Sequence, residues 1–263
     1  MASPRFYVPG ALSAPAILAL PEAAAHHAAH VLRLRNGDVV TLFNGSGGEY
    51  AARISAIGKH DVSVAIEHHL PVERESPLPV TLVQALSSGE RMDLTIQKVV
   101  ELGVSRIVPV ESERSVVRLK GERAEKRVAH WRQVVVSACE QCGRNRIPEV
   151  RMISPLAVWL AAEQTNPNMD EGMDEVDRVG NRRSSAALRW VLLPGATGAL
   201  RDLPRPQQPI ELLVGPEGGL TDAEADAARR AGYQPLRLGP RVLRTETAAP
   251  ALLAALQALW GDF

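Results

Sequence analysis

Two short stretches near the end of the chain carry residues that could do chemistry. Residues 213–220 read Leu-Val-Gly-Pro-Glu-Gly-Gly-Leu, and residues 238–247 read Leu-Gly-Pro-Arg-Val-Leu-Arg-Thr-Glu-Thr. Each stretch is an apolar run, a Gly-Pro turn and then polar residues that open a helix. Glycine lets backbone groups approach a flat ligand, and proline fixes the turn. Two such loops, with Arg241, Arg244 and Glu246 in the second, favour a ligand site over a pair of ordinary turns.

The residue types narrow the kind of ligand. The loop at 215–219 lacks the Lys-Ser/Thr pair that ends a phosphate-binding loop, and it does not match the dinucleotide fingerprint. Backbone donors and acceptors at a glycine-rich turn suit an adenine-type ring. The sequence therefore predicts a site that reads an adenine with main-chain hydrogen bonds.

Strands and helices alternate over most of the chain and must position these loops. Apolar runs predict strands at 80–86, 106–110, 188–193, 210–214 and 236–238, and helical patterns lie between and after them, including 122–142 and a capping box at 221–224. This alternation predicts an α/β domain with a mainly parallel sheet over 73–263, and its ligand site lies beyond the carboxyl ends of the strands.

Residues 1–72 differ in character. Short strands at 39–43, 49–54 and 62–66, separated by glycine turns, predict a small β-barrel with one helix near 21–32. Within the larger domain, residues 163–187 are polar and acidic, and they predict a mobile insertion.

Charge and composition limit the class of protein. No apolar run reaches the ~18 residues of a membrane helix, and the N-terminus lacks a signal peptide, which predicts a cytoplasmic protein without a membrane partner. The net charge is zero, but six acidic residues between Glu163 and Asp177 are offset by basic residues that cluster at 114–132 and 144–151. A basic stripe is typical of a nucleic-acid binder, and the alternative is a solvated helix face.

Cys139 and Cys142 have the spacing of a redox or zinc motif. A structural zinc site would need two further ligands, and the chain has no other cysteine. We expect both thiols to be reduced and to pack at a helix end closed by Gly143, and we expect no metal site.

Several segments together resemble the RsmE family of ribosomal RNA methyltransferases, in the SPOUT class of knotted enzymes that use S-adenosylmethionine. His30–Arg33 with Gly37-Asp38 looks like the PUA-like module of that family. The other matching segments are 97–104, 112–114, 138–149, 215–219 and 238–247.

The resemblance implies a SPOUT-type parallel sheet with a C-terminal trefoil knot, and a PUA-like barrel before it. It implies a homodimer that methylates N3 of one uridine (the U1498 type) in 16S rRNA of the small ribosomal subunit. Two alternatives stay open: an RNA-binding or ribosome-assembly factor without catalysis, and a SPOUT methyltransferase that acts on transfer RNA.

Carried onto this chain, the resemblance implies a donor pocket made of three loops. Main-chain groups of Gly215, Leu238 and Leu243 would bind the adenine. The expected cofactor-binding residues are Leu193, Pro194, Gly195, Val214, Gly215, Pro216, Glu217, Gly218, Leu238, Gly239, Pro240, Val242, Leu243 and Thr245.

Methylation at N3 makes further demands, because the uracil N3–H must lose a proton. A carboxylate could accept that proton, and a cation could stabilise the uracil anion. Glu246 and Glu217 are the candidate bases, and Arg241 and Arg244 are the candidate cations. Either glutamate could instead serve the turn or the helix end. The expected phosphate contacts are Arg33, Arg114, Arg118, Arg144 and Arg146.

Pro250 departs from the family pattern. Proline in a helix interior costs ~3 kcal/mol, whereas the first turn has no N–H bonds to lose. We therefore predict that the last helix begins at or after Thr245, with Pro250 in or close to its first turn.

Overall fold

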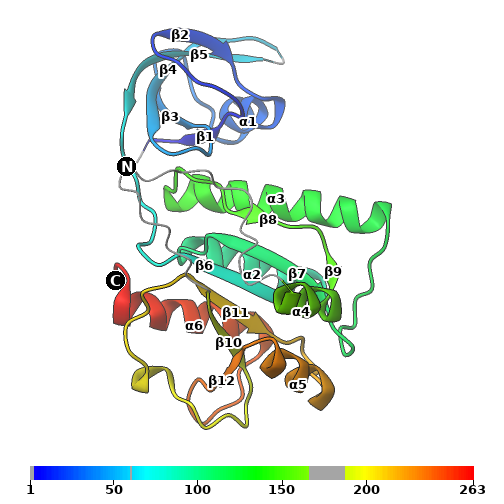
Figure 1. The fold of residues 1–263 in the computed structure, drawn as a ribbon. Coiled ribbons are helices and arrows are strands. Elements are labelled where there is room, and N and C mark those ends of the chain that lie inside the picture. The colour runs from blue at the N-terminus through cyan, green and yellow to red at the C-terminus, as the bar shows by residue number, and fades with distance from the viewer. Residues whose placement is uncertain (1–2, 60, 166–186) are drawn as a thin grey trace. The chain divides into compact units, whose positions relative to one another are not determined.

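The computed structural model describes residues 3–59, 61–165 and 187–263, and these form two compact units. The first unit comprises Met1–Glu75 and Val135–Ile147, and the second comprises Ser76–Val134 and Pro148–Phe263. Helix α3 (Glu122–Cys142) therefore contributes to both units (Figure 1). The sequence contains no signal that residues 135–147 join the first unit, and the domain boundary at residues 72 and 73 stays a prediction.

The first unit is built on a five-stranded sheet in the order β1-β3-β4-β5-β2. Neighbouring strands are antiparallel except for the parallel pair β1 and β3. The predicted helix after Pro21 is present, but its second half is a π-helix, which periodicity alone does not reveal. The elements are β1 Arg5–Tyr7, β2 Ala16–Ala19, α1 Glu22–His26 with the π-helix His27–Val31, β3 Val39–Phe43, β4 Glu49–Ile57 and β5 Val62–Leu70.

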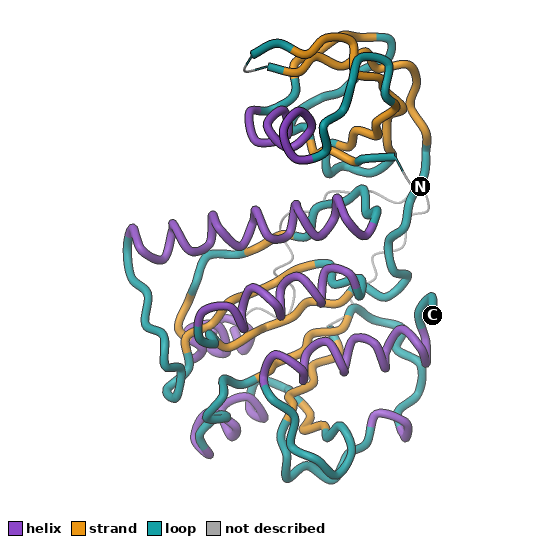
Figure 2. The backbone as a smooth tube through the Cα atoms, turned by 180° about the vertical axis from the view of Figure 1, so that it is seen from behind, coloured by secondary structure: helices purple, strands orange, loops and turns teal. Residues whose placement is uncertain are grey.

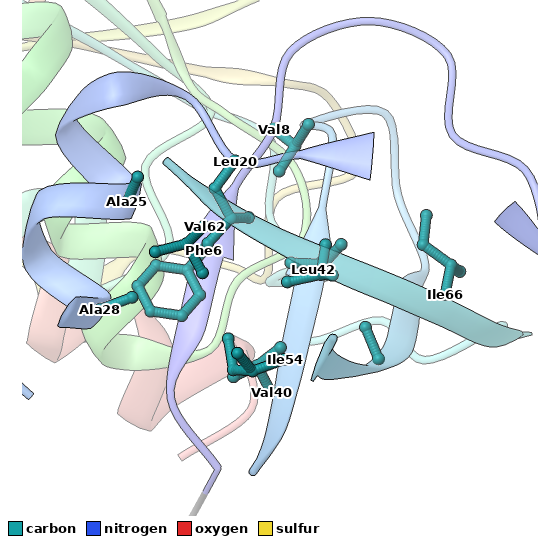
Figure 3. Packing of buried hydrophobic residues seen from close by; sticks show 12 residues of the cluster. Phe6, Val8, Leu20, Ala25, Ala28, Val40, Leu42, Ile54, Val62 and Ile66 are labelled. Atoms are coloured by element: carbon teal, nitrogen blue, oxygen red, sulfur yellow. The ribbon is translucent and has the colours of Figure 1, made fainter. Parts of the chain in front are cut away.

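Alternating side chains of these strands form the core of the first unit. Val40 and Leu42 on β3 and Ile54 on β4 are buried against Phe6. Figure 3 shows the Phe6 ring beside Ala28 of the helical segment. Burying each large apolar side chain contributes about 1.5–3 kcal/mol relative to leaving it exposed, so this cluster is a main source of stability for the unit.

Polar contacts join residues 135–147 to the rest of the first unit. The carboxylate of Glu49, at the start of β4, accepts three hydrogen bonds. The donors are Arg5 Nη1 at 2.6 Å, Arg74 Nη1 at 2.9 Å and Asn145 Nδ2 at 3.3 Å. Arg144 pairs with Glu75 through both Nε and Nη2. These side chains connect three segments that are distant in the sequence.

Glu49 should make the stability of the first unit depend on pH. Burial alone would raise its pKa, but hydrogen bonds from Arg74, Arg5 and Asn145 outweigh burial and lower the pKa to about 2. The native pKa lies below that of the unfolded chain, so the stabilisation is fully present above about pH 4.5 and is lost as pH falls towards 2. The lowered pKa of Glu49 corresponds to a contribution of about 3 kcal/mol to the free energy of unfolding at neutral pH.

Urea unfolding of the wild type and of Glu49→Gln at pH 7 and pH 3 measures this effect. We expect the wild type to be more stable than the variant at pH 7, and the difference to shrink at pH 3. An equal difference at both pH values would show that the Glu49 charge is not what the network stabilises.

The second unit contains a sheet in the order β12-β10-β11-β6-β7-β8, with β9 paired to β7, and every pair is parallel. This confirms the parallel sheet with alternating strands and helices. The strands are β6 Val80–Ala85, β7 Arg106–Glu111, β8 Glu149–Val150, β9 Ser154–Pro155, β10 Leu188–Leu192, β11 Ile210–Val214 and β12 Gln234–Leu236.

Helices cover both faces of this sheet. Leu156 and Leu160 of α4 and Ala228 of α5 pack with Val83 and Leu213 on one face. On the other face, α2 and α6 lie side by side (Figure 2). The helices are α2 Gly89–Glu101, α4 Leu156–Thr165, α5 Asp222–Arg230 with the predicted capping box at Thr221, α6 Thr245–Trp260, and a 3₁₀ turn Leu200–Asp202.

Two boundaries differ from the prediction. The last strand spans Gln234–Leu236 rather than 236–238, and beyond it Arg237 forms only an isolated bridge to Ala199, with its N–H bonded to the carbonyl of Gly198. Helix α4 continues through residues 163–165, so the predicted insertion does not begin at 163. The remainder of that insertion, 166–186, lies outside the described residues.

Helix α6 begins at Thr245, which confirms the predicted start. Arg244 is its N-cap residue, and its carbonyl accepts the N–H groups of Thr247 and Ala248. Pro250 is the sixth residue of the helix, and it lacks the N–H that would bond to the carbonyl of Glu246. The helix therefore tolerates proline close to its first turn, as predicted.

No helix in the described part of the chain is long and apolar enough to cross a membrane.

Candidate functional site

A cavity of about 620 Å³ lies in the second unit, where the loops after β10, β11 and β12 meet the start of α6. This volume is in the range of small-molecule and cofactor sites. Of the expected site residues, those that line the cavity are Leu193, Pro194, Val214, Gly215, Pro216, Glu217, Gly218, Leu238, Arg241, Val242, Leu243, Arg244, Thr245 and Glu246.

Three expected cofactor residues, Gly195, Gly239 and Pro240, are not among the lining residues. They lie in the same loops, and Gly239 has a φ of +69°, which glycine adopts without strain. These residues shape the turns that carry the lining residues. Arg114, which the sequence singled out as a phosphate contact, also lines the cavity. The lining residues that were not among the expected site residues are Arg91, Leu192, Gly219, Leu220, Leu236, Arg237 and Ala248.

The glycines of the first loop are required by close packing. A Cβ on Gly215 would lie 3.2 Å from Cγ and from the backbone N of Leu220, and one on Gly218 would lie 3.2 Å from Cβ of Arg114. Arg114 Nη1 also donates to the carbonyl of Gly218 at 3.1 Å. The loop is therefore folded back on itself and held from the side by Arg114.

Thr245 connects this loop to helix α6 and to the sheet. Its hydroxyl donates to the carbonyl of Gly215 at 2.9 Å and accepts from Nε2 of the fully buried Gln84 at 3.2 Å. Gln84 lies near the carboxyl end of β6. Thr245 therefore fixes the floor of the cavity.

We expect Thr245→Val to destabilise the protein by about 1–3 kcal/mol, because the half-buried Gly215 carbonyl loses a donor and the buried Gln84 amide loses one of its two acceptors. Binding of S-adenosylmethionine should weaken with it, since Gly215 is an expected main-chain ligand. Urea unfolding and titration calorimetry measure the two effects. The matched control is Thr247→Val, which alters an exposed threonine on the same turn of α6. Equal behaviour of both variants would contradict this role of Thr245.

Glu217 is held by three donors. Its Oε1 accepts from Ser88 N at 3.0 Å, Ser88 Oγ at 3.2 Å and Arg91 Nη1 at 3.0 Å. Burial alone would raise the pKa of Glu217, but hydrogen bonds from the Ser88 backbone, its own backbone and Arg91 outweigh burial and lower it. A carboxylate with a lowered pKa and several donors is a poor proton acceptor. The geometry favours the turn-binding interpretation of Glu217.

Glu246 is in a different situation. Its side chain is 14% exposed and lies in the first turn of α6, at 3.9 Å from Arg91 Nε and 4.0 Å from Arg244 Nη1. Its Oε2 is buried and has no hydrogen-bond partner among the described residues. A buried carboxylate oxygen without a donor costs free energy, and the Glu246 side chain that carries it is one of those lining the cavity.

Arginines dominate the charged lining of the cavity. Arg114 and Arg91 are engaged by the contacts above, whereas Arg244 has a side chain that is 83% exposed. Arg241 is also exposed. The mouth is therefore positively charged, which suits an anionic partner, and Glu217 and Glu246 supply the opposing charge. The arginines are Arg91, Arg114, Arg237, Arg241 and Arg244.

The five expected phosphate contacts divide into different environments. Arg33 and Arg146 are exposed in the first unit, and Arg118 is exposed in the second. Arg114 is exposed but holds the Gly218 loop. Arg144 was predicted wrongly: it is only 4% exposed and pairs with Glu75, so a phosphate cannot reach it without unfolding this contact.

The cysteines lie at the end of α3. Cys139 is buried, and burial raises its pKa to about 12, so its thiol stays protonated at neutral pH. Gly143 follows with a φ of +88°, which is the helix-closing geometry that the sequence predicts. No group of metal-binding side chains lies among the described residues.

Sequence reasoning missed Arg91 and Ser88. Ser88 is the residue before α2, and Arg91 lies in the first turn of that helix, and nothing nearby in the sequence marks Glu217 as their partner. The partner of Arg91, Glu217, is 126 residues away from it along the chain, so local sequence patterns cannot reveal the contact.

Known proteins resemble the whole chain. A family model described as an RNA methyltransferase domain matches residues 74–257, and a model described as an RNA methyltransferase PUA domain matches residues 20–67. A protein of Buchnera aphidicola subsp. Schizaphis graminum, named Ribosomal RNA small subunit methyltransferase E, is 33% identical over 259 residues, which is 98% of this chain and 97% of that protein.

Solved structures agree. A Ribosomal RNA small subunit methyltransferase E from Neisseria gonorrhoeae, bound to S-adenosyl methionine, is 41% identical with a TM-score of 0.85, and a methyltransferase of Legionella pneumophila with bound SAM is 39% identical with a TM-score of 0.86. Both matches cover 100% of each chain. They confirm the SPOUT-type α/β fold and the PUA domain, while the knot stays a prediction. By sequence and by structure, this chain belongs to the Ribosomal RNA small subunit methyltransferase E family, which is the RsmE family predicted from its motifs.

Proposed function

We propose that the protein transfers a methyl group from S-adenosylmethionine to N3 of one specific uridine in 16S rRNA, within the small ribosomal subunit in the cytoplasm. The observation that carries this proposal is the cavity between two glycine loops, whose lining includes exposed arginines and Glu246, a glutamate with one buried oxygen that has no donor among the described residues. Membership of the RsmE family supports the substrate class.

The cavity fits the proposed donor. Its lining is rich in leucine and includes Gly215, Leu238 and Leu243, the residues whose main-chain groups we expect to bind an adenine. Glu217 and Glu246 supply negative charge for a ligand that carries a sulfonium cation. When bound, the donor supplies an electrophilic methyl group. We assign the adenine to main-chain groups of Gly215, Leu238 and Leu243.

We assign the proton transfer to Glu246. Its carboxylate accepts the N3 proton of uracil, and the freed N3 electron pair forms the new bond to the methyl carbon while the bond from that carbon to sulfur breaks. Arg244 or Arg241 stabilises the negative charge that spreads to the uracil oxygens. Glu217 holds the loop and takes no proton.

We also propose that Arg33, Arg118 and Arg146 contact RNA phosphates and that the protein is a homodimer. Their exposed guanidinium groups are free of the burial that removes Arg144 from this role. The homodimer is what the resemblance to the RsmE family implies. Sedimentation equilibrium tests the dimer.

The test of the proposal offers tritiated S-adenosylmethionine and three RNA substrates to the purified protein. The substrates are small subunits from cells that lack the modification, free 16S rRNA and bulk transfer RNA. We expect label in the 16S rRNA of the subunits. Label in transfer RNA would favour a transfer-RNA methyltransferase. No label, with donor binding still detected by calorimetry, would move the substrate elsewhere, and loss of both would favour a non-catalytic RNA-binding factor.

A further inference from the structure

The N-terminus of α2 contributes a charged side chain to the site. Arg91, the third residue of α2, lines the cavity with a side chain that is 47% exposed. Its Nη1 lies 3.0 Å from Glu217 Oε1, and its Nε lies 3.9 Å from Glu246 Oε1. A single guanidinium therefore lies between a carboxylate of the loop at 215–219 and a carboxylate of the first turn of α6.

The packing of α2 against α6 explains why Arg91 reaches both. At the far ends of the helices, Gln257 Nε2 donates to the carbonyl of Leu102 at 2.9 Å, and at the near ends Arg91 meets Glu246. The two helices therefore run parallel, with their N-termini together at the cavity. Because α2 packs against α6, the backbone of Arg91 is held at a defined position beside the first turn of α6.

We infer that Arg91 is a positioning residue of the methyl transfer, because its guanidinium holds Glu217 and Glu246 in one arrangement and so aligns the loop at 215–218 with the first turn of α6. This inference rests on the proposed function. Arg91 engages Oε1 of Glu246, whereas Oε2 of that carboxylate is left without a donor. The guanidinium of Arg91 thus attracts one oxygen of Glu246 across 3.9 Å, while the carboxylate keeps acceptor capacity for a substrate N–H.

The role is alignment rather than stability. Half-exposed ion pairs contribute little to the free energy of unfolding, so a variant at Arg91 should fold normally. A misalignment of about 1 Å at a reacting group can cost about 100-fold in rate. The planar fork of arginine can bridge two carboxylates, whereas the ammonium of lysine acts as one point charge.

The test compares Arg91→Gln and Arg91→Lys with Arg229→Gln. The control removes the same charge from an exposed pair with Asp226 on α5, away from the cavity lining. We expect Arg91→Gln to lower the single-turnover rate on small subunits by about 10- to 100-fold, with the Kd for S-adenosylmethionine changed by less than about 3-fold. The single-turnover rate of Arg91→Lys should lie between those of the wild type and Arg91→Gln. The rate of Arg229→Gln should match that of the wild type.

A second readout does not depend on the RNA substrate. The Glu217 carboxyl, observed by ¹³C NMR and assigned with Glu217→Gln, should titrate at a higher pH in Arg91→Gln, because Arg91 is one of the donors that lower its pKa. If the wild type methylates no small-subunit RNA, the proposed function fails while this titration still decides whether Arg91 holds Glu217. An unmoved Glu217 titration, or an unchanged rate in Arg91→Gln, would overturn the inference.

Discussion

Replacing Glu246 by Gln is expected to lower the single-turnover rate of methyl transfer by about 100- to 1000-fold, since general bases contribute about 10²–10⁴. The amide retains the size of the side chain but cannot take the N3 proton. Donor binding should weaken much less than the rate falls, because the expected adenine ligands are main-chain groups and the variant removes only one of the two carboxylates that oppose the sulfonium charge. Rapid-quench assays on small subunits give the rate, and calorimetry gives the Kd for S-adenosylmethionine.

Glu217→Gln is the matched comparison, since it removes a carboxylate from the wall of the same cavity. We expect a smaller loss of rate, because Glu217 is already occupied by Ser88 and Arg91 and serves the loop. If Glu217→Gln showed the large loss and Glu246→Gln kept most of the rate, the assignment of the proton acceptor would be reversed.

Replacing Arg144 by Ala is expected to destabilise the protein by about 3–5 kcal/mol, because removing one partner of a buried pair leaves the other charge unpaired. The Arg144 side chain is 5% exposed and that of its partner Glu75 is 23% exposed. Urea unfolding measures the change, and the milder Arg144→Lys keeps the charge if the alanine variant does not fold.

Arg146→Ala separates stability from RNA binding. The Nη2 of Arg146 lies 3.5 Å from Oε1 of Glu73, and both side chains are exposed. We therefore expect the variant to lose less than about 1 kcal/mol of unfolding free energy. Its RNA affinity should become less dependent on salt by about one unit of slope. The prediction fails if Arg144→Ala is as stable as the wild type, or if Arg146→Ala leaves the slope of RNA affinity against salt unchanged.

The parallel sheet and the location of the site could be predicted because local residue patterns determine them. Buried parallel strands such as 210–214 are continuous apolar runs, and a capping box places both of its residues within four positions at Thr221 and Glu224. The glycine loops follow strands directly, so the carboxyl edge of the sheet brings them together without any long-range information.

Charged partners could not be predicted in the same way. Arg144 looked like a phosphate contact because a sequence shows the charge of a residue but not what neutralises it, and Glu75 lies 69 positions away. Arg91 was overlooked for the related reason that its role depends on how α2 packs against α6. The last strand was misplaced by two residues because its extent depends on where β12 pairs with β10, at Gln234–Leu236, and that pairing is not visible in the local sequence.

The most direct measurement is the identity of the methylated nucleoside in 16S rRNA from small subunits treated with the purified protein and S-adenosylmethionine. Digestion and mass spectrometry are compared for the wild type and for Glu246→Gln. We predict 3-methyluridine at a single position with the wild type and almost none with the variant. A methyl group on another atom or another nucleoside, or equal product from both proteins, would contradict the proposed chemistry.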